Sequence, residues 1–337
     1  MRIEQNYSLE SYNTFHLSVK TRWFMEYETE EELQRILHDE YFQECLSLHI
    51  GGGSNLLFIN DFNGIILHSQ IKGFSVVGET DEQVLLHVGA AEKWDDVVDY
   101  AVAHGWGGIE NLSAIPGEAG AAAIQNIGAY GTEIKDVVEQ VETVNQLTFE
   151  KRIFTNKECE YGYRYSFFKD EHNDPYIVTG VVLRLDKQPV YNLNYGNLKE
   201  ELKNVGQLSL KAVRSAVISI RAAKLPDPDQ LGNAGSFFMN PIIEPAHFAK
   251  LKELYPDIPS YPLENGKVKV PAGWLIDQCG FKGKQHGAVG VYEKQALVLV
   301  NLGGAEGHEI ALVAESIRMA VNDRFGITLN PEVRYIG

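Results

Sequence analysis

Residues 46–55 read LSLHIGGGSN, a short apolar run that leads directly into three glycines. The run predicts a strand at 46–50, and the glycines predict a turn whose backbone can adopt positive φ. Such a turn lets backbone N–H groups approach an anion closely, and Ser54 and Asn55 add side-chain donors. Taken alone, the stretch is equally typical of an ordinary tight turn.

A second glycine-rich stretch, residues 115–131, reads IPGEAGAAAIQNIGAYG, and we expect it to be a long loop. Its residues are nearly all small, so a bulky flat ligand could lie directly on the main chain. The alternative is a seam where small residues pack closely. Two such stretches in one chain favour a shared ligand over coincidence.

The usual phosphate-binding motifs are absent. The sequence contains no GxxxxGK[ST] motif, and no GxGxxG motif stands between a strand and a helix. A P-loop is thereby excluded and a Rossmann site is unsupported. We therefore expect a phosphate-bearing cofactor held in another geometry, by the loops at 51–55 and 115–131.

Apolar periodicity predicts a mixture of helices and strands around these loops. The expected helices are 29–38, 91–104 and 309–324, and the expected strands are 46–50, 64–68, 84–88, 137–144, 176–185 and 330–337. Because hairpins alternate with isolated helices, the order favours an α+β fold. Two prolines in KLPDPD, residues 224–229, mark a seam before a separate unit that starts near Gly232.

Composition narrows the classes of function. The 337 residues are 44% hydrophobic and 23% charged, as in a globular protein of two or three domains. A formal net charge of −16 disfavours binding to nucleic acid or anionic membranes. Three separated cysteines argue against a disulfide framework, and no apolar run suggests a signal or a membrane span, so we expect a cytoplasmic protein. The ten histidines show no metal-binding spacing, and no metal is expected.

Three side chains are candidates for chemistry. Arg164 stands among aromatic residues and needs a carboxylate partner, which either the protein or a substrate could supply. Ser236 lies in GSFFMNP without a nucleophile-elbow motif, so it is either a turn residue or a proton donor in a dry site. Glu332 is either exposed at a strand edge or directed into a site. Lys224 reads by default as a solvated lysine and Tyr195 as a turn aromatic.

Several motifs together resemble the UDP-N-acetylenolpyruvoylglucosamine reductase (MurB) family, over nearly the whole chain. They are YNTF 12–15, GGGSNLL 51–57, IPG 115–117, QNIGAYG 125–131, YRYS 163–166, KLPDP 224–228, GSFFMNP 235–241 and PEVR 331–334. The serine motif and the Pro-Gly loop are specific in combination, whereas related flavoproteins share the three-glycine loop.

The resemblance implies a two-part FAD-binding domain of the vanillyl-alcohol-oxidase (VAO/PCMH) type and a C-terminal α+β substrate-binding domain. By this likeness residues 1–69, joined by a terminal strand in 325–337, form the first FAD-binding subdomain. Residues 70–224 form the second, and residues 225–324 form the substrate-binding domain. The segment 188–205, which includes Tyr195, resembles the extra substrate loop of the longer, type I members.

The resemblance also implies an activity, that of a UDP-N-acetylmuramate dehydrogenase in peptidoglycan precursor synthesis, which serves cell shape and division. NADPH would reduce non-covalently bound FAD, and hydride would then pass to the methylene carbon of the enolpyruvyl ether of a UDP-sugar. Arg164 and Glu332 would stabilise the enolate-like charge, which requires Glu332 to be protonated or hydrogen-bonded. Ser236 would donate the proton to the other carbon, assisted by a polarising neighbour such as Lys224 or Asn240.

The binding residues follow from the same likeness, and we expect a monomer. The sugar nucleotide would be held by Tyr195, Lys224, Asn240 and Gln295. FAD would be held by Gly51, Gly52, Gly53, Ser54, Asn55, Pro116, Gly117, Gly120, Gln125, Asn126, Gly128, Ala129, Tyr130 and Arg334. Two alternatives stay open: a flavin oxidoreductase of the same superfamily with another substrate, and a non-catalytic nucleotide-binding module.

Overall fold

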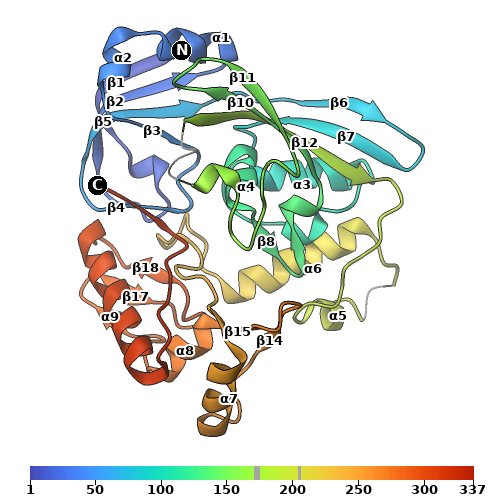
Figure 1. The fold of residues 1–337 in the computed structure, drawn as a ribbon, viewed down its shortest axis with the longest axis vertical. Coiled ribbons are helices and arrows are strands. Elements are labelled where there is room, and N and C mark those ends of the chain that lie inside the picture. Colours follow the sequence, from blue (N-terminus) through green and yellow to red (C-terminus); the bar gives the residue numbers. More distant parts are fainter. Residues whose placement is uncertain (171–174, 204–205) are drawn as a thin grey trace. The chain divides into compact units, whose positions relative to one another are not determined.

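In the computed structural model, which describes residues 1–170, 175–203 and 206–337, the chain divides into two units (Figure 1). Unit 1 comprises residues 1–7, 21–52 and 63–223. Unit 2 comprises residues 8–20, 53–62 and 224–337. The boundaries fall at strand ends and inside the first glycine-rich loop, between Gly52 and Gly53.

The first sheet of unit 1 has four strands in the order β1-β2-β5-β3. Their bounds are β1 Arg2–Ser8, β2 Lys20–Tyr27, β5 Phe62–Ser69 and β3 Ser47–Ile50. Helices α1 (Glu30–Leu37) and α2 (Glu40–Glu44) begin where the side chains of Thr29 and Asp39 accept backbone N–H groups. Strand β3 runs parallel to β5, which places Ile50 beside His68 and starts the glycine-rich loop at the sheet edge.

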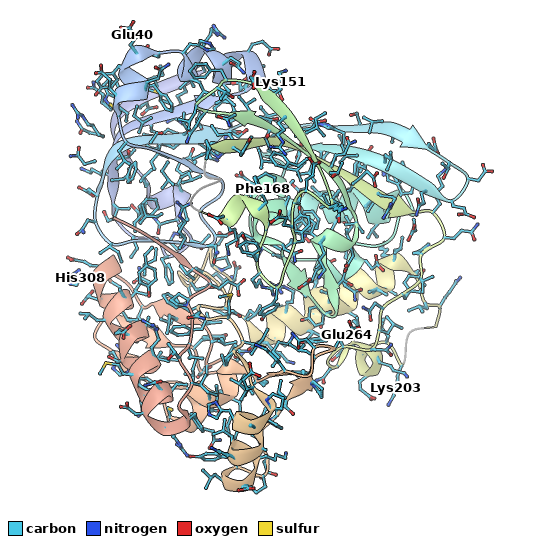
Figure 2. The ribbon with its side chains drawn as sticks, in the orientation of Figure 1. Glu40, Lys151, Phe168, Lys203, Glu264 and His308 are labelled. Atoms are coloured by element: carbon cyan, nitrogen blue, oxygen red, sulfur yellow. The ribbon has the colours of Figure 1, made fainter. Side chains whose placement is uncertain are left out.

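The second sheet of unit 1 is antiparallel, with five strands in the order β11-β10-β12-β7-β6. Their bounds are β6 Phe74–Glu79, β7 Gln83–Gly89, β10 Val138–Asn145, β11 Lys151–Thr155 and β12 Tyr176–Asp186. Helices α3 (Trp94–Ala103) and α4 (Ala119–Gln125) share one buried core with the sheet and lie against it in Figure 1. Phe168, labelled in Figure 2, belongs to this core and packs edge-on against Phe154 with ring centroids 5.0 Å apart.

Further helices and a hairpin complete unit 1. They are the 3-10 helices η2 Glu110–Leu112, η3 Ile134–Asp136 and η4 Phe167–Lys169, the hairpin strands β8 Gly128–Ala129 and β9 Thr132–Glu133, and helices α5 Leu198–Glu201 and α6 Leu210–Lys224. Helix α6 buries Val213, Val217 and Ile220 against Leu198 of α5, with Tyr130 of the hairpin turn packed on the same cluster.

Unit 2 contains small sheets and three longer helices. Its elements are η1 Glu10–Tyr12, β4 Leu56–Phe58, β13 Ile242–Ile243, α7 Pro245–Leu254, β14 Tyr261–Pro262, β15 Val268–Lys269, α8 Ala272–Gln278, β16 Gln285–His286, β17 Val289–Val291, β18 Leu299–Asn301, α9 Gly307–Phe325 and β19 Arg334–Ile336. The sheets have the orders β13-β15-β14, β16-β17-β18 and β19-β4. Strand β19 runs parallel to β4, so the last strand of the chain pairs with residues 56–58.

Most elements predicted from periodicity are present, with three corrections. Helix α3 begins at Trp94 and not at Ala91, and β19 covers only Arg334–Ile336 of the predicted strand 330–337. The predicted loop at 115–131 is wrong in part, because it contains α4. Alanine is the best helix former, so the run AGAAAIQ can form a helix despite its glycine.

The predicted division into residues 1–69, 70–224 and 225–324 stays a prediction. Within the described residues, no helix combines the length and the apolar character needed to cross a bilayer.

Candidate active site

The first glycine-rich loop starts directly after β3 and contacts the second one. A Cβ placed on Gly51 would lie 2.9 Å from Oε2 of Glu118 and 3.6 Å from Cβ of Ala121. Gly53 has φ +68°, and a Cβ there would overlap the carbonyl oxygen of Tyr12. Glycine is therefore required at 51 for the approach of the two loops and at 53 for the path of the chain.

The second loop is a turn, a helix and a hairpin in succession. Gly117 adopts φ +117°, and α4 ends at Asn126 in the left-handed conformation. Tyr130 and Gly131 then both have positive φ, as a two-residue turn between β8 and β9 requires. A short helix with small residues thus replaces the expected irregular loop.

Gly120 supports the alternative interpretation of a packing seam. A Cβ placed on it would lie 3.0 Å from Cβ of Ala90 and 3.4 Å from Cγ1 of Val178. The glycine therefore lets α4 approach β7 and β12 closely. Ligand binding and close packing are both compatible with this stretch, because the small residues have different neighbours along it.

Arg164 contacts the second loop from a separate turn of the chain, at residues 162–165. Its Nη2 donates to the carbonyl oxygen of Gly128 at 2.7 Å, and its guanidinium lies 5.4 Å from the ring centroid of Tyr163. A side chain on Gly128 would collide with Arg164, since a Cβ there would lie 2.8 Å from Nη1. Asn126 steadies this region from a buried position, because its amide donates to Gly162 at 2.7 Å and accepts from Lys135. The arginine is thus fixed by backbone acceptors of the predicted cofactor loop.

Tyr195 lies beside the hairpin turn, and its side chain is 41% exposed. A Cβ placed on Gly131 would lie 3.3 Å from Cβ of Tyr195. Asn111 ties the turn to the Tyr195 segment, because its amide donates to Tyr130 at 2.9 Å and to Asn192 at 2.7 Å. Of the predicted substrate loop 188–205, positions 204 and 205 lie outside the described residues.

Ser236 and Glu332 lie on paired segments of unit 2. The N–H of Glu332 donates to the carbonyl oxygen of Phe237 at 2.8 Å, and Phe238 forms an antiparallel bridge with Pro331. Gly235, with φ +66°, turns the chain directly before the serine. The fold therefore joins these two predicted catalytic residues, which are far apart in the sequence.

The first loop also supports the Glu332 segment within unit 2. The side-chain amide of Asn55 donates to the carbonyl oxygen of Glu332 at 2.9 Å, and Arg334 N–H donates to Asn55 at 3.0 Å. Asn55, predicted to bind cofactor, thus holds the backbone on both sides of Val333. Arg334 itself is exposed.

Asn240 and Gln295 meet at the start of α8. Oδ1 of Asn240 accepts the N–H of Ala272 at 2.9 Å. A Cβ placed on Gly273 would lie 2.8 Å from Oε1 of Gln295. Leu297, two residues beyond Gln295, accepts the N–H of Phe237 at 2.7 Å, which connects this cluster to the serine segment. Ser236, Asn240 and Gln295, all predicted site residues of unit 2, therefore lie on adjoining segments.

Sequence reasoning missed Arg221. It lies on α6, one turn after the buried Val217, whereas the predicted Lys224 is exposed at the end of the helix. Nε of Arg221 donates to Ala114 at 3.1 Å, and burial lowers the pKa of its guanidinium. Among residues 1–170, 175–203 and 206–337, no ion pair includes it. The apolar period of residues 210–224, with an arginine on its apolar side, is the signal that could have found it.

These residues fit a cofactor with a diphosphate. Gly51 and Gly52 present backbone without side chains of their own, and unit 1 holds two fixed guanidinium groups, Arg164 and Arg221, near the second loop. Burial raises the pKa of Tyr130, so its hydroxyl stays protonated and can donate a hydrogen bond. Such a set of donors and cations can hold a dinucleotide without a Rossmann fingerprint.

Comparison with known proteins gives two sequence-family matches. A profile described as an FAD binding domain matches residues 22–147. A profile described as the C-terminal domain of UDP-N-acetylenolpyruvoylglucosamine reductase matches residues 227–336.

Full-length relatives agree with these profiles. The UDP-N-acetylenolpyruvoylglucosamine reductase of Porphyromonas gingivalis is 49% identical over 337 residues, which cover 100% of both chains. The reductase of Bacteroides fragilis is 48% identical over 334 residues, or 99% of this chain and 100% of the relative. The solved structure of the Thermus caldophilus reductase matches 100% of both chains with a TM-score of 0.72 at 24% identity. The predicted α+β class, with an FAD-binding domain and a reductase-type C-terminal domain, is confirmed.

Proposed function

This chain belongs to the UDP-N-acetylenolpyruvoylglucosamine reductase family, and on that premise we propose that Arg164, Ser236 and Glu332 are its catalytic residues. It is an FAD-dependent oxidoreductase of peptidoglycan precursor synthesis with UDP-N-acetylmuramate dehydrogenase activity. The observation that carries the residue assignment is the pairing of the Ser236 segment with the Glu332 segment. This backbone pairing brings two residues that are 96 positions apart onto neighbouring segments.

The reaction adds a hydride and a proton across the double bond of the enolpyruvyl ether. When bound, FAD supplies hydride transfer, from NADPH to the methylene carbon of the substrate. The pair of electrons displaced from the double bond collects on the adjacent carbon and on its carboxylate. The protein must therefore stabilise negative charge and deliver one proton.

Arg164 and Glu332 stabilise that charge. The guanidinium of Arg164 is held by the carbonyl oxygen of Gly128, so it needs little reorganisation when charge develops. Glu332 acts as a hydrogen-bond donor in its protonated form, because an ionised carboxylate would repel the enolate-like state. Removing one donor from such a set costs roughly 100- to 1000-fold in rate.

Ser236 delivers the proton to the carbon beside the carboxylate. Its backbone is fixed between Gly235 and Phe237, whose N–H donates to Leu297 at 2.7 Å. A serine hydroxyl is a weak acid, so a polarising group must assist it, and Lys224 and Asn240 are the candidates. Lys224, Asn240, Gln295 and Tyr195 hold the sugar nucleotide, whose diphosphate requires local positive charge.

FAD binds to the two glycine-rich loops. The residues we assign to it are Gly51, Gly52, Gly53, Ser54, Asn55, Pro116, Gly117, Gly120, Gln125, Asn126, Gly128, Ala129, Tyr130 and Arg334. The contact of Gly51 with Glu118 and Ala121 supports a joint role for the loops. We further propose that the enzyme is a cytoplasmic monomer.

Separation of the two half-reactions tests the proton-donor role. In Ser236→Ala, stopped-flow absorbance should show flavin reduction by NADPH within about twofold of wild type. Reoxidation by the enolpyruvyl sugar nucleotide should slow by about 100-fold or more. Ser316→Ala, which removes an exposed hydroxyl on α9, is the matched control and should leave both rates unchanged. Equal losses in both halves for Ser236→Ala would refute the role.

A further inference from the structure

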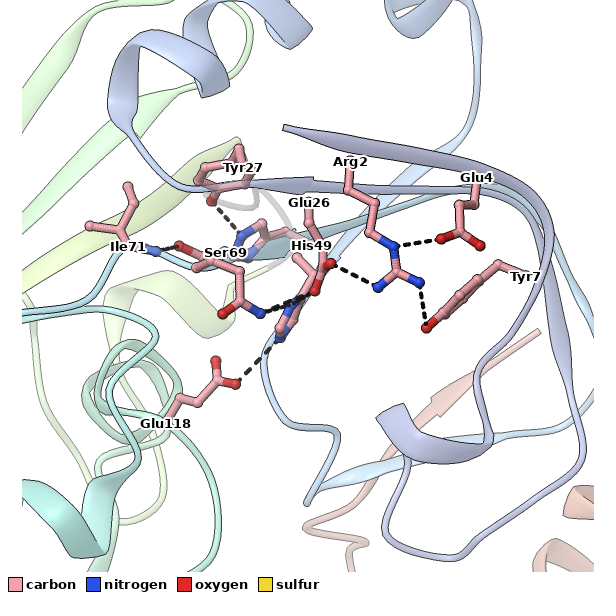
Figure 3. A network of polar contacts seen from close by, with 11 residues as sticks. Arg2, Glu4, Tyr7, Glu26, Tyr27, His49, Ser69, Ile71 and Glu118 are labelled. Atoms are coloured by element: carbon pink, nitrogen blue, oxygen red, sulfur yellow. Dashed lines mark hydrogen bonds and ion pairs between the residues drawn. The ribbon is translucent and has the colours of Figure 1, made fainter.

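A row of charged side chains in unit 1 has no part in the reaction described above (Figure 3). Nη1 of Arg2 lies 3.1 Å from Glu26, Nδ1 of His68 lies 3.0 Å from Glu26, and Nε2 of His68 lies 3.4 Å from Glu118. The side chain of His68 is 5% exposed, and those of Glu26 and Glu118 are 12% and 14% exposed. The row therefore runs from the surface at Arg2 to the interior at Glu118.

His68 stands between two carboxylates. Nε2 faces an oxygen of Glu118 at 3.4 Å, and a carboxylate can only accept, so Nε2 donates to Glu118. Nδ1 lies 3.0 Å from an oxygen of Glu26 and 3.1 Å from the side-chain amide nitrogen of Gln70. The imidazole therefore links Glu118 to Glu26 and Gln70.

Glu118 ends the row against the first glycine-rich loop. A Cβ on Gly51 would lie 2.9 Å from its Oε2, and a Cβ on Gly52 would lie 3.6 Å from its Oε1. Glu118 immediately precedes α4, yet its side chain makes no capping hydrogen bond to that helix. The carboxylate is thus directed to the loop and to His68, where uncompensated negative charge would repel a diphosphate.

We propose that His68 is a positioning residue for cofactor binding: it donates a hydrogen bond to Glu118 beside Gly51 and Gly52 and so allows the loop to hold the FAD diphosphate. Glu118 fills the space behind the two glycines, and the N–H of His68 offsets part of the electrostatic cost of placing an acid there. The inference rests on the proposed role of Gly51 and Gly52 in holding FAD.

The proposal predicts an asymmetric double-mutant cycle. Apoprotein freed of FAD is prepared from wild type, His68→Gln, Glu118→Gln and the double variant, and FAD affinity is measured by quenching of flavin fluorescence. His68→Gln should raise the Kd about tenfold or more, because Glu118 keeps its charge and loses its partner. Glu118→Gln should bind FAD as well as wild type or better. The double variant should return to within about threefold of Glu118→Gln.

Two controls separate this effect from general damage. His87→Gln removes a second imidazole–carboxylate pair of unit 1, to Glu142 at 3.1 Å, and should leave the Kd unchanged. Thermal unfolding of each apoprotein shows whether the variants fold. Rescue by the second substitution would not occur if His68 merely supported the sheet.

The outcomes separate the two proposals. Additive losses in the double variant, or no loss in His68→Gln, overturn the role of His68. Gly52→Ala tests the loop itself, since a Cβ there meets only an ordinary contact and φ is not positive. If Gly52→Ala leaves FAD affinity unchanged, the proposed loop contact is wrong. If it weakens FAD binding while His68→Gln does not, the His68 inference alone is wrong.

Discussion

His49 is partly buried in unit 1, with its Nε2 2.7 Å from the hydroxyl of Tyr27. Loss of hydration, and to a smaller extent the neighbouring His68, lower the pKa of His49 from 6.5 to about 3. The unfolded chain therefore takes up a proton below pH 6.5 that the folded chain does not accept until about pH 3. The stability that neutral His49 contributes is complete above pH 6.5 and is lost as the pH falls.

Replacing His49 with glutamine should remove this part of the pH dependence. One such histidine contributes a slope of up to ~1.4 kcal/mol per pH unit to the free energy of unfolding. Urea unfolding at about pH 7.5, 6.5 and 5.5 should show a flatter decline for His49→Gln than for wild type.

His87 provides a control in which the pKa is shifted in the opposite direction. A hydrogen bond that His87 donates to the carboxylate of Glu142 raises the pKa of His87, so its contribution is complete below pH 6.5 and is lost as the pH rises through the raised value. His87→Gln should therefore change the slope on the alkaline side. Parallel curves for wild type and His49→Gln would contradict the first prediction.

At single residues, the sequence predicted that glycines mattered but not the reason at each position. Gly53 is required because the carbonyl oxygen of Tyr12 occupies its Cβ position, and Gly120 because Ala90 and Val178 lie so close. Those neighbours come from distant parts of the chain. Local sequence motifs do not predict these neighbours, and they do not predict that His68 lies between Glu26 and Glu118.

Among the elements, those with a clear apolar period were predicted well. Helix α1 and strands β3, β10 and β12 lie within about two residues of their expected bounds. Helix α1 has one regular apolar face, and β12 is an almost continuous buried run, so both are marked in the sequence. Helix α4 was not predicted, because glycine and small residues obscured its helical period. It also gave no helix at 210–224, although α6 buries Val213, Val217 and Ile220.

The Tyr195 segment offers a test at this scale. Asn111 is buried, and its side-chain amide donates both to the β8–β9 turn and to Asn192. Removing this amide therefore releases the Tyr195 segment from the β8–β9 turn. In Asn111→Ala we expect the KM for the sugar nucleotide to rise about fivefold or more, a loss of about 1 kcal/mol, with kcat nearly unchanged. Steady-state kinetics measure both values.

Asn192→Ala is the graded control for this prediction. Its side-chain amide donates to Gly131 at 2.9 Å in an exposed position, so a smaller rise in KM is expected. An unchanged KM in Asn111→Ala would show that this tether does not serve substrate binding. FAD affinity should stay within about twofold of wild type in both variants.

For the molecule as a whole, the net charge of −16 opposes an anionic substrate at long range. At ~10 mM salt the screening length is about 30 Å, so the total charge acts on an approaching sugar nucleotide. At ~150 mM salt the screening length is about 8 Å, so the total charge is screened. Only cations close to the substrate, such as Arg164 and Arg221, then still attract it. We therefore expect kcat/KM for the sugar nucleotide to rise about two- to fivefold between these salt concentrations.

A salt titration at constant pH measures this effect, with KCl and NaCl compared to separate screening from ion-specific activation. A steady fall of kcat/KM with salt would mean that local cations steer the substrate even at long range. Equal responses to the two salts are expected, because screening depends on ionic strength alone.

The proposed catalytic residues could be brought together from the sequence only through family resemblance. Arg164 belongs to unit 1, whereas Ser236 and Glu332 belong to unit 2, and no spacing rule relates them. Composition and motifs did predict the phosphate-bearing cofactor, because glycine-rich turns act locally. The position of a buried cation such as Arg221 could not be predicted in this way, because its neighbour Ala114 is distant in the sequence.

The parallel pairing of β19 with β4 has a consequence for how the enzyme is made. Residues 330–336 supply both the partner of β4 and the segment that pairs with residues 237–239, and they are synthesised after both. On the ribosome, unit 1 can therefore fold first, whereas the Ser236 segment waits for its last neighbours. We expect nascent chains stalled before residue 330 to be cleaved by protease between residues 224 and 320 while unit 1 resists. Activity then begins only after residues 330–336 have been synthesised and paired.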